Sequence, residues 1–276
     1  MEIGSDSLTL ALVSEVFSTE DELVSCLKTA RSQGADLAVL PELPLNEWSP
    51  ATKKARLEDA ESPGGWREII QCNAARRAEI AVLGGVIRAM SNGRRINLAL
   101  LISAQGAIMD SSAKHVLPDE EGFWECDHYE PVEDPPQVIE FMGAKVGVQI
   151  CSDANRPTAA QLLAAQGAHV ILAPRATSIS SWKRWRLAYR AMALTASAWV
   201  VSVCRPRPEF GVEMGGPSLV VDPMGEVVLE TTDRIATVVL DRRAVEDARQ
   251  SYPGYLAWPA KAYVAGWENI LRNQQK

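Results

Sequence analysis

Three side chains that could act together in nucleophilic catalysis each follow an apolar stretch of this sequence. Glu42 ends DLAVLPE, Lys114 ends GAIMDSSAK and Cys151 ends VGVQIC. A thiol, whose free pKa is about 8.5, is a poor nucleophile until it loses its proton. A partly buried carboxylate can take that proton, and an ammonium can stabilise both the thiolate and a developing oxyanion. Taken together, the three residue types indicate covalent catalysis by a cysteine.

The stretch VGVQICSDANRP predicts how Cys151 is presented. Residues 146–150 alternate in the period-2 pattern of a packed strand. Asn155, followed by Arg156 and Pro157, is typical of the residue that opens a helix. Cys151 should therefore lie at a strand-to-helix turn, where a rigid sheet can hold it toward a cleft. Alone, this stretch fits a buried structural cysteine better; the other two strand ends favour the catalytic interpretation.

Other catalytic signatures receive little support. The sequence has no GxSxG elbow and no GxxxxGK[ST] phosphate loop. Of its histidines, His169 lies in an apolar run and is expected to be structural. A Cys–His hydrolase that uses His115 or His128 stays open as an alternative, although nothing local to either residue favours it.

Composition narrows the class of protein. The 276 residues are 47% hydrophobic and 23% charged, with a net charge of −7 and no cationic run, so a nucleic-acid partner is not expected. The five cysteines are scattered without CxxC or metal-ligand spacing. No signal peptide and no apolar run of membrane-spanning length is found. We expect a cytoplasmic protein with reduced thiols, no metal and no cofactor.

The pattern of elements predicts one α/β domain over residues 1–276. Strands and helices interleave without a strict βαβ rhythm, which favours two sheets face to face with helices outside. Short connections between residues 80 and 114 predict antiparallel neighbours. Strands are expected over residues 8–14, 35–42, 80–88, 96–103, 106–114, 146–151, 168–174, 199–205, 217–223, 226–231 and 235–241, and helices over 20–33, 65–78, 181–197 and 243–250, with one more after Asn155. Residues 115–136 form a long loop rich in acidic and aromatic residues, and a loop of that length is usually functional.

The segments LAVLPELPL, AKHVLPDEEGFWE and VGVQICSDANRP are similar, in order and spacing, to the three signature segments of the nitrilase (carbon–nitrogen hydrolase) superfamily. The resemblance covers nearly the whole chain. It implies a four-layer α-β-β-α sandwich that is usually dimeric.

Carried over by motif, the resemblance assigns roles to individual residues. Glu42 would be the general base, Lys114 the electrostatic stabiliser and Cys151 the nucleophile. Glu125 matches a second glutamate that many members place beside this triad. The backbone N–H of Ser152 would complete the oxyanion hole with Lys114.

The resemblance also implies an activity, which is hydrolysis of a non-peptide C–N bond in a small amide or N-carbamoyl compound through a cysteine thioester. The Cys151-Ser152-Asp153 sequence is more like the amidase branches than true nitrilases, which tend to carry glutamate at the third position. Ser152 and Thr158 stand where an aromatic residue and a glutamate are common, which places the chain away from the best-known subgroups. Alternatives are a nitrilase, a non-catalytic binding protein on the same fold, and the glutaminase half of an ammonia-channelling synthetase.

Arg175 carries the expectation about the substrate. It follows the strand AHVILAP, and its fork of donors suits a carboxylate remote from the scissile bond. The alternative is that Arg175 pairs with a local acid such as Glu125 or Asp153, or faces solvent.

Further contacts are expected with the substrate and with a partner subunit. Trp48, Trp124 and Asn155 are expected to bind the small-molecule amide, urea or carbamoyl substrate. Apolar helices after Cys151 and around residues 188–198 predict a homodimer or a multiple of it. The tail from residue 251, which carries Pro253, Gly254 and Pro259, is expected to extend to the partner.

Overall fold

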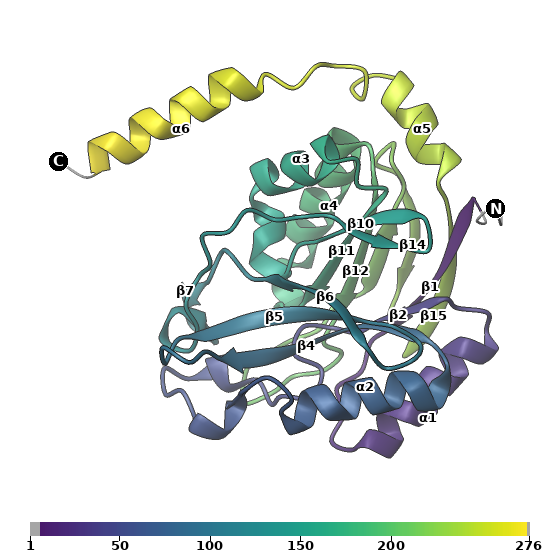
Figure 1. Ribbon diagram of the computed structural model, residues 1–276, viewed down its shortest axis with the longest axis vertical. Helices are drawn as coiled ribbons and strands as arrows, with labels where there is room; N and C mark the ends of the chain where they lie inside the picture. Colours follow the sequence, from purple (N-terminus) through teal and green to yellow (C-terminus); the bar gives the residue numbers. More distant parts are fainter. Residues whose placement is uncertain (1–5, 275–276) are drawn as a thin grey trace.

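The computed structural model describes residues 6–274 and contains two sheets that lie face to face (Figure 1). In the first sheet the strands run in the order β15-β1-β2-β4-β5-β6, and β3 pairs with β4. Its strands are β1 (Ser7–Val13), β2 (Leu37–Val39), β3 (Ala60–Glu61), β4 (Ala81–Ala89), β5 (Arg95–Ile102), β6 (Ile108–Ala113) and β15 (Ile235–Asp241).

The second sheet has the order β14-β13-β12-β11-β10-β9. Its strands are β9 (Ile139–Phe141), β10 (Ala144–Val148), β11 (Val170–Arg175), β12 (Trp199–Cys204), β13 (Ser218–Val221) and β14 (Val227–Thr231). Strands β10, β11 and β12 are parallel, so their carboxyl ends meet at one edge of the sheet. In α/β sheets this edge is where ligands bind.

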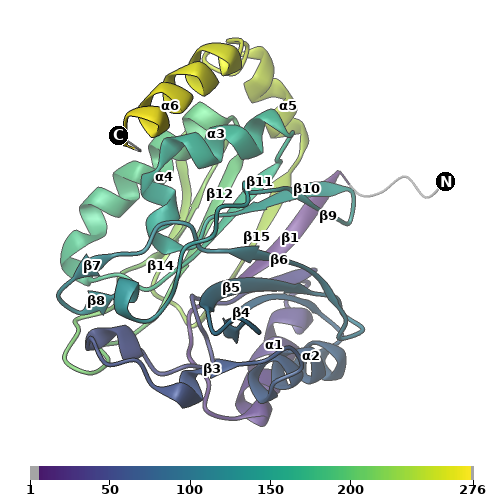
Figure 2. The same cartoon turned by 60° about the vertical axis from the view of Figure 1, so that its left-hand side comes forward.

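Helices cover the outer face of each sheet (Figure 2). The helices α1 (Glu20–Ser32) and α2 (Trp66–Ala78) pack on the first sheet, and α3 (Pro157–Ala165) and α4 (Trp182–Ala196) pack on the second. The largest buried cluster lies between the two sheets and takes Leu, Val and Ile side chains from both. The expected four-layer α-β-β-α sandwich is confirmed.

Local signals in the sequence explain where α1 begins and ends. Thr19 and Glu22 form a capping box, in which the Glu22 N–H donates to Thr19 Oγ1 and the Thr19 N–H donates to the Glu22 carboxylate, each at 3.3 Å. Gly34 follows the helix with a φ of +87°, a conformation that glycine adopts without steric cost.

Most expected elements are present within one to four residues of their predicted ends, and the antiparallel pairing of β4, β5 and β6 is confirmed. Two local predictions were wrong. The strand expected over residues 35–42 spans only Leu37–Val39. The residue that precedes α3 is Arg156, because Cys151–Asn155 forms a 3₁₀ turn before the helix begins at Pro157.

The loop over residues 115–136 contains a small hairpin of β7 (Asp119–Glu120) and β8 (Phe123–Trp124). The carboxyl-terminal segment holds α5 (Arg243–Gln250), as expected, and α6 (Ala260–Gln274), which was not foreseen. All described residues of α6 are exposed, and the helix projects away from the body (Figure 1). No helix within residues 6–274 has both the length and the apolar character to cross a membrane.

Gly84→Ala should destabilise the first sheet. A Cβ on Gly84 would lie 1.8 Å from Gln71 Oε1. The Gln71 amide ties α2 to β4 because it accepts from the Gly85 N–H at 2.9 Å and donates to the Gly85 carbonyl at 3.2 Å. Overpacking of this kind costs about 1–3 kcal/mol, which urea unfolding would measure.

The matched control is Gly266→Ala on α6, where a Cβ would meet no heavy atom within 4 Å. This variant should unfold at the wild-type urea concentration or slightly above it, because alanine favours a helix more than glycine does. A Gly84→Ala protein as stable as the control would contradict the close packing of Gln71 on β4.

Candidate active site

The two sheets bring three strand ends to one point. Glu42 follows β2, Lys114 directly follows β6, and Cys151 follows β10. The side chains of Glu42 and Lys114 are fully buried, and Lys114 Nζ donates to Glu42 Oε1 at 2.7 Å. Cys151 adopts a φ of +49°, which is uncommon for a residue with a side chain and marks a sharp turn after the strand.

Glu125 completes a buried charged cluster with Glu42 and Lys114. It follows β8 at the start of a 3₁₀ turn, and both of its carboxylate oxygens accept from Lys114 Nζ, at 2.7 and 2.6 Å. These distances agree with the expectation that Glu125 lies beside Glu42 and Lys114.

Burial sets the electrostatics of this cluster. Burial and the nearby Glu42 carboxylate raise the pKa of Glu125 to about 8, although the Lys114 ammonium acts against them. Burial opposes the charge on Lys114, but the Glu125 and Glu42 carboxylates hold its pKa well above the usual value. Glu125 is therefore easier to protonate than an ordinary glutamate, while Lys114 keeps its charge.

The peptide group of Ala176, just after β11, connects Cys151 to the cluster. The Ala176 N–H donates to Glu42 Oε2 at 3.0 Å, and the Cys151 thiol donates to the Ala176 carbonyl at 3.3 Å. Burial and the Glu42 carboxylate raise the pKa of the Cys151 thiol well above its usual value. The resting sulfur is therefore a protonated thiol close to a carboxylate.

Asp153 fixes the turn that carries Cys151. Its carboxylate accepts from the Ile150 N–H at 3.2 Å, the His115 N–H at 3.0 Å and the Val116 N–H at 2.8 Å. One side chain thereby joins the turn after β10 to the loop after Lys114. Asp153 thus holds the backbone around Cys151 and Lys114 in position.

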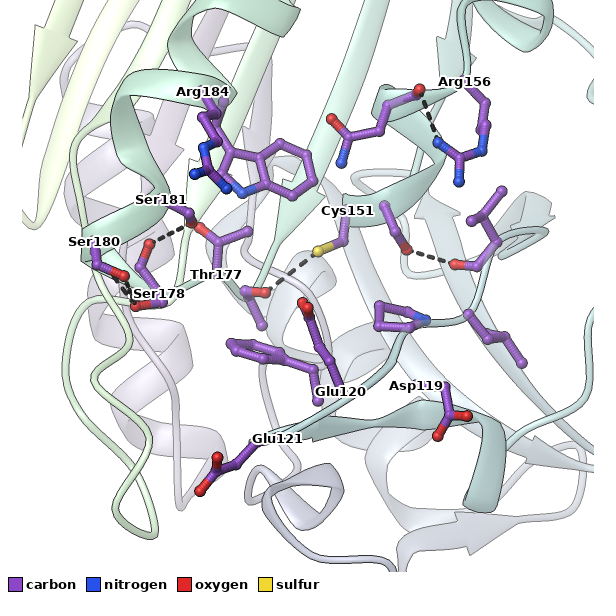
Figure 3. A pocket seen from close by; sticks show the side chains of 18 residues that line it. Asp119, Glu120, Glu121, Cys151, Arg156, Thr177, Ser178, Ser180, Ser181 and Arg184 are labelled. Carbon is purple, nitrogen blue, oxygen red and sulfur yellow. Dashed lines mark hydrogen bonds between the residues drawn. The ribbon is translucent and has the colours of Figure 1, made fainter.

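Cys151 opens onto a pocket of about 740 Å³ (Figure 3). Ser152, Ala176 and Thr177 lie with it at the base of the pocket. Residues 116–121 and Phe123 line one wall, and five residues of the segment that leads into α4 line another, namely Ser178, Ser180, Ser181, Arg184 and Trp185. Asn155, expected at the substrate site, also lines this pocket.

Arg175 does not line the pocket, which corrects the prediction made for it. Its side chain is fully buried and donates to Thr177 Oγ1, to Ser202 Oγ at 3.0 Å and to the Pro217 carbonyl at 2.6 Å. It pairs with neither of the acids proposed as alternatives. The guanidinium also lies 4.8 Å from the centre of the Trp182 ring.

The two tryptophans expected at the substrate site also lie outside the lining. Trp48 is buried, donates to the Gly122 carbonyl at 2.9 Å, and packs edge-on against Phe123 at 5.8 Å. Trp124 is half-buried under Lys53, whose Nζ lies 4.0 Å from the ring centre. Phe123, which Trp48 supports, lines the pocket instead. Over residues 6–274, no three His, Cys, Asp or Glu side chains are grouped as metal ligands.

Residues 8–250 match the sequence model of the carbon-nitrogen hydrolase family. The chain belongs to this family. It is 27% identical over 239 residues to the chloroplastic omega-amidase of Arabidopsis thaliana, a match that covers 82% of this chain and 64% of that protein. It is 26% identical over 273 residues to omega-amidase NIT3 of Saccharomyces cerevisiae, which covers 91% and 93%. These relatives place the hydrolase in the amidase branch of the nitrilase superfamily.

Solved structures share the fold of this hydrolase. A carbon-nitrogen hydrolase from Helicobacter pylori G27 superposes with a TM-score of 0.86 at 18% identity, covering 93% of this chain and 97% of that chain. Nit3 of Saccharomyces cerevisiae, described as a member of branch 10 of the nitrilase superfamily, superposes with a TM-score of 0.77 at 24% identity, covering 92% and 97%.

Two residues that hold Glu42 in the hydrolase were not predicted from the sequence. Asn97 on β5 donates to Glu42 Oε1 at 2.8 Å. Arg205, after β12, donates to the carbonyls of Glu42 and Leu43 at 2.9 and 2.7 Å and pairs with Glu209 at 2.6 Å. Both carried a signal, since each is a polar residue within or just beyond a buried apolar strand, where polar groups need partners.

The hydrolase should alkylate slowly at Cys151 when no substrate is bound. Iodoacetamide reacts with thiolates, and the raised pKa keeps Cys151 protonated at pH 7. Cys126 is exposed and should be modified first, as peptide mass spectrometry over time would show. The Cys151 rate should rise with pH and stay below the Cys126 rate at pH 8. Faster modification of Cys151 at pH 7 would mean that it rests as a thiolate.

Proposed function

We propose that this hydrolase cleaves the C–N bond of a small amide through a thioester on Cys151, with Glu42 as general base and Lys114 as electrostatic stabiliser. The observation that carries the proposal is the Ala176 peptide group, which bonds both to Glu42 and to Cys151 at the base of the pocket. Nucleophile, base and ammonium are thus held together where a substrate can enter.

In the first half of the reaction, Glu42 removes the thiol proton as Cys151 Sγ attacks the amide carbon. The carbonyl oxygen becomes an oxyanion, which Lys114 and the backbone N–H of Ser152 stabilise. Glu42 then passes the proton to the leaving nitrogen. The C–N bond breaks, ammonia or an amine departs, and the acyl group stays on the sulfur.

In the second half, water takes the place of the departed amine. Glu42 accepts a proton from this water as its oxygen attacks the thioester carbon, and a second oxyanion forms in the same place. Its collapse breaks the C–S bond and releases the carboxylic acid. The proton held by Glu42 returns to the sulfur, which restores the thiol.

Glu125 acts in this scheme as a positioning residue. Its two oxygens hold Lys114 Nζ, and its raised pKa avoids a second full negative charge beside Glu42. The omega-amidase relatives and the Cys151-Ser152-Asp153 sequence both favour an amide over a nitrile as the substrate.

Cys151→Ala should reduce ammonia release from a panel of small amides below detection while the fold is kept. Glu42→Gln and Lys114→Ala should each lower kcat/KM by about a thousandfold or more. Double variants should lose little more than single ones, because the residues act as a unit.

Cys72→Ala on α2 is the control and should keep wild-type activity. Circular dichroism would confirm that each variant is folded. Substantial turnover by folded Cys151→Ala would overturn the mechanism, and a wild-type protein that turns over no amide but binds one would favour the non-catalytic alternative.

We further propose a homodimer in which the segment from residue 251 packs on a second copy of the chain. The segment leaves large apolar side chains exposed, among them Tyr252, Tyr255, Leu256, Trp258, Tyr263, Val264, Trp267, Ile270 and Leu271. On the body, Leu162 and Leu187 are also exposed on α3 and α4. Residues 189–196 of α4, by contrast, turn their apolar stripe inward. Two-fold exchange of the segments would cover these surfaces.

The double variant Trp267→Glu with Ile270→Glu should shift the protein from dimer to monomer. The control, Asn269→Glu with Asn273→Glu, adds the same charge at two polar positions of α6 and should stay dimeric. Light scattering at micromolar concentration would measure both masses. A wild-type protein that is monomeric there would refute the proposal.

A further inference from the structure

The pocket above Cys151 carries charges of opposite sign on facing walls. Glu120, on β7, and Arg184, on α4, both line the pocket and are exposed to it. The Glu120 carboxylate points toward Cys151, and Arg184 extends from the opposite side (Figure 3). Asp119 and Glu121 flank Glu120 but point away from the cysteine.

Glu120 and Arg184 have no ionic or hydrogen-bonded partner among the described residues, and they do not pair with each other. Other arginines of α4 are paired: Arg186 meets Glu230 at 2.7 Å, and Arg190 meets Glu226 at 3.2 Å. Glu120 and Arg184 thus leave a charge of each sign on facing walls of the pocket, where both are free for a ligand.

We infer that the substrate is an amide whose far end carries both an ammonium and a carboxylate, as in a free α-amino acid. This inference rests on the proposed function. The carboxylate would pair with Arg184, whose guanidinium can hold two oxygens at once, and the ammonium would pair with Glu120. These two contacts would orient the amide carbon toward Cys151.

The charge of the whole pocket argues against a purely anionic substrate. Its lining includes three carboxylates, from Asp119, Glu120 and Glu121, and two guanidinium groups, from Arg156 and Arg184. An anion without a cationic group would gain from Arg184 but would meet the Glu120 carboxylate unpaired. Like-charge juxtaposition of this kind is a common way to reject the wrong partner.

Four primary amides of similar size separate the contributions: L-glutamine, glutaramate without the ammonium, 4-aminobutanamide without the carboxylate, and butanamide without either. Each releases ammonia, so one assay gives all four values of kcat/KM. L-Glutamine should have the highest value, about tenfold or more above glutaramate and 4-aminobutanamide.

Two variants assign the charges. Glu120→Gln should lower the glutamine-to-glutaramate ratio of kcat/KM about tenfold, and Arg184→Gln should lower the glutamine-to-4-aminobutanamide ratio by a similar factor. Asp127→Asn and Lys183→Gln are matched controls, because each removes one exposed charge that is close in sequence to Glu120 or Arg184 but does not line the pocket, and both should keep the wild-type ratios.

The outcomes distinguish this inference from the function on which it rests. Glutaramate hydrolysed as well as L-glutamine, or ratios that Glu120→Gln leaves unchanged, would overturn the inference while amide hydrolysis stands. No ammonia from any of the four amides would count against the proposed function, and the inference would fail with it.

Discussion

The rest of the structure depends on one buried ammonium held between the side chains of two glutamates. Lys114 Nζ is removed from water and meets Glu42 and Glu125 within 2.7 Å. An unpaired charge in such a place would be costly, and loss of one partner from a buried pair typically costs about 3–5 kcal/mol. Since Glu42 and Lys114 follow strands of the first sheet and Glu125 lies in the long loop, the cluster is satisfied only when that sheet and the loop are in place together.

The sandwich holds the active-site residues in place because the ends of its strands are rigid. Backbone N–H and C=O groups at these ends have no partner within the sheet and can bond to side chains. The Ala176 peptide group serves Glu42 on one side and Cys151 on the other. Arg205 and Asn97 hold Glu42, and Asp153 holds the cysteine turn. Buried polar side chains therefore hold Glu42 and the Cys151 turn in place where the regular strands have ended.

Much of this could be predicted from the sequence, because alternation and apolar runs report directly on strands. Glu42, Lys114 and Cys151 stood out as polar residues at the ends of such runs. The prediction that Arg175 faces the substrate was wrong, although the alternation of its own strand indicates the correct direction. Ile171 and Ala173 pack toward the helices, whereas Val170 and Leu172 face the other sheet, so an odd-numbered Arg175 points toward α4. The helix α6 was not predicted because two prolines and a glycine precede it. The place of Phe123 in the pocket was not predicted because a loop has no periodic pattern in the sequence.

The neutral state of the Cys151 sulfur has a consequence for the protein's durability. Peroxide oxidises thiolates to sulfenic acid, and neutral thiols react far more slowly. A nucleophile that rests protonated, bonded to a carbonyl and nearly closed off from water, gives little opening to such oxidants. Oxidative damage should then accumulate at the exposed Cys126 before it reaches the residue on which turnover depends.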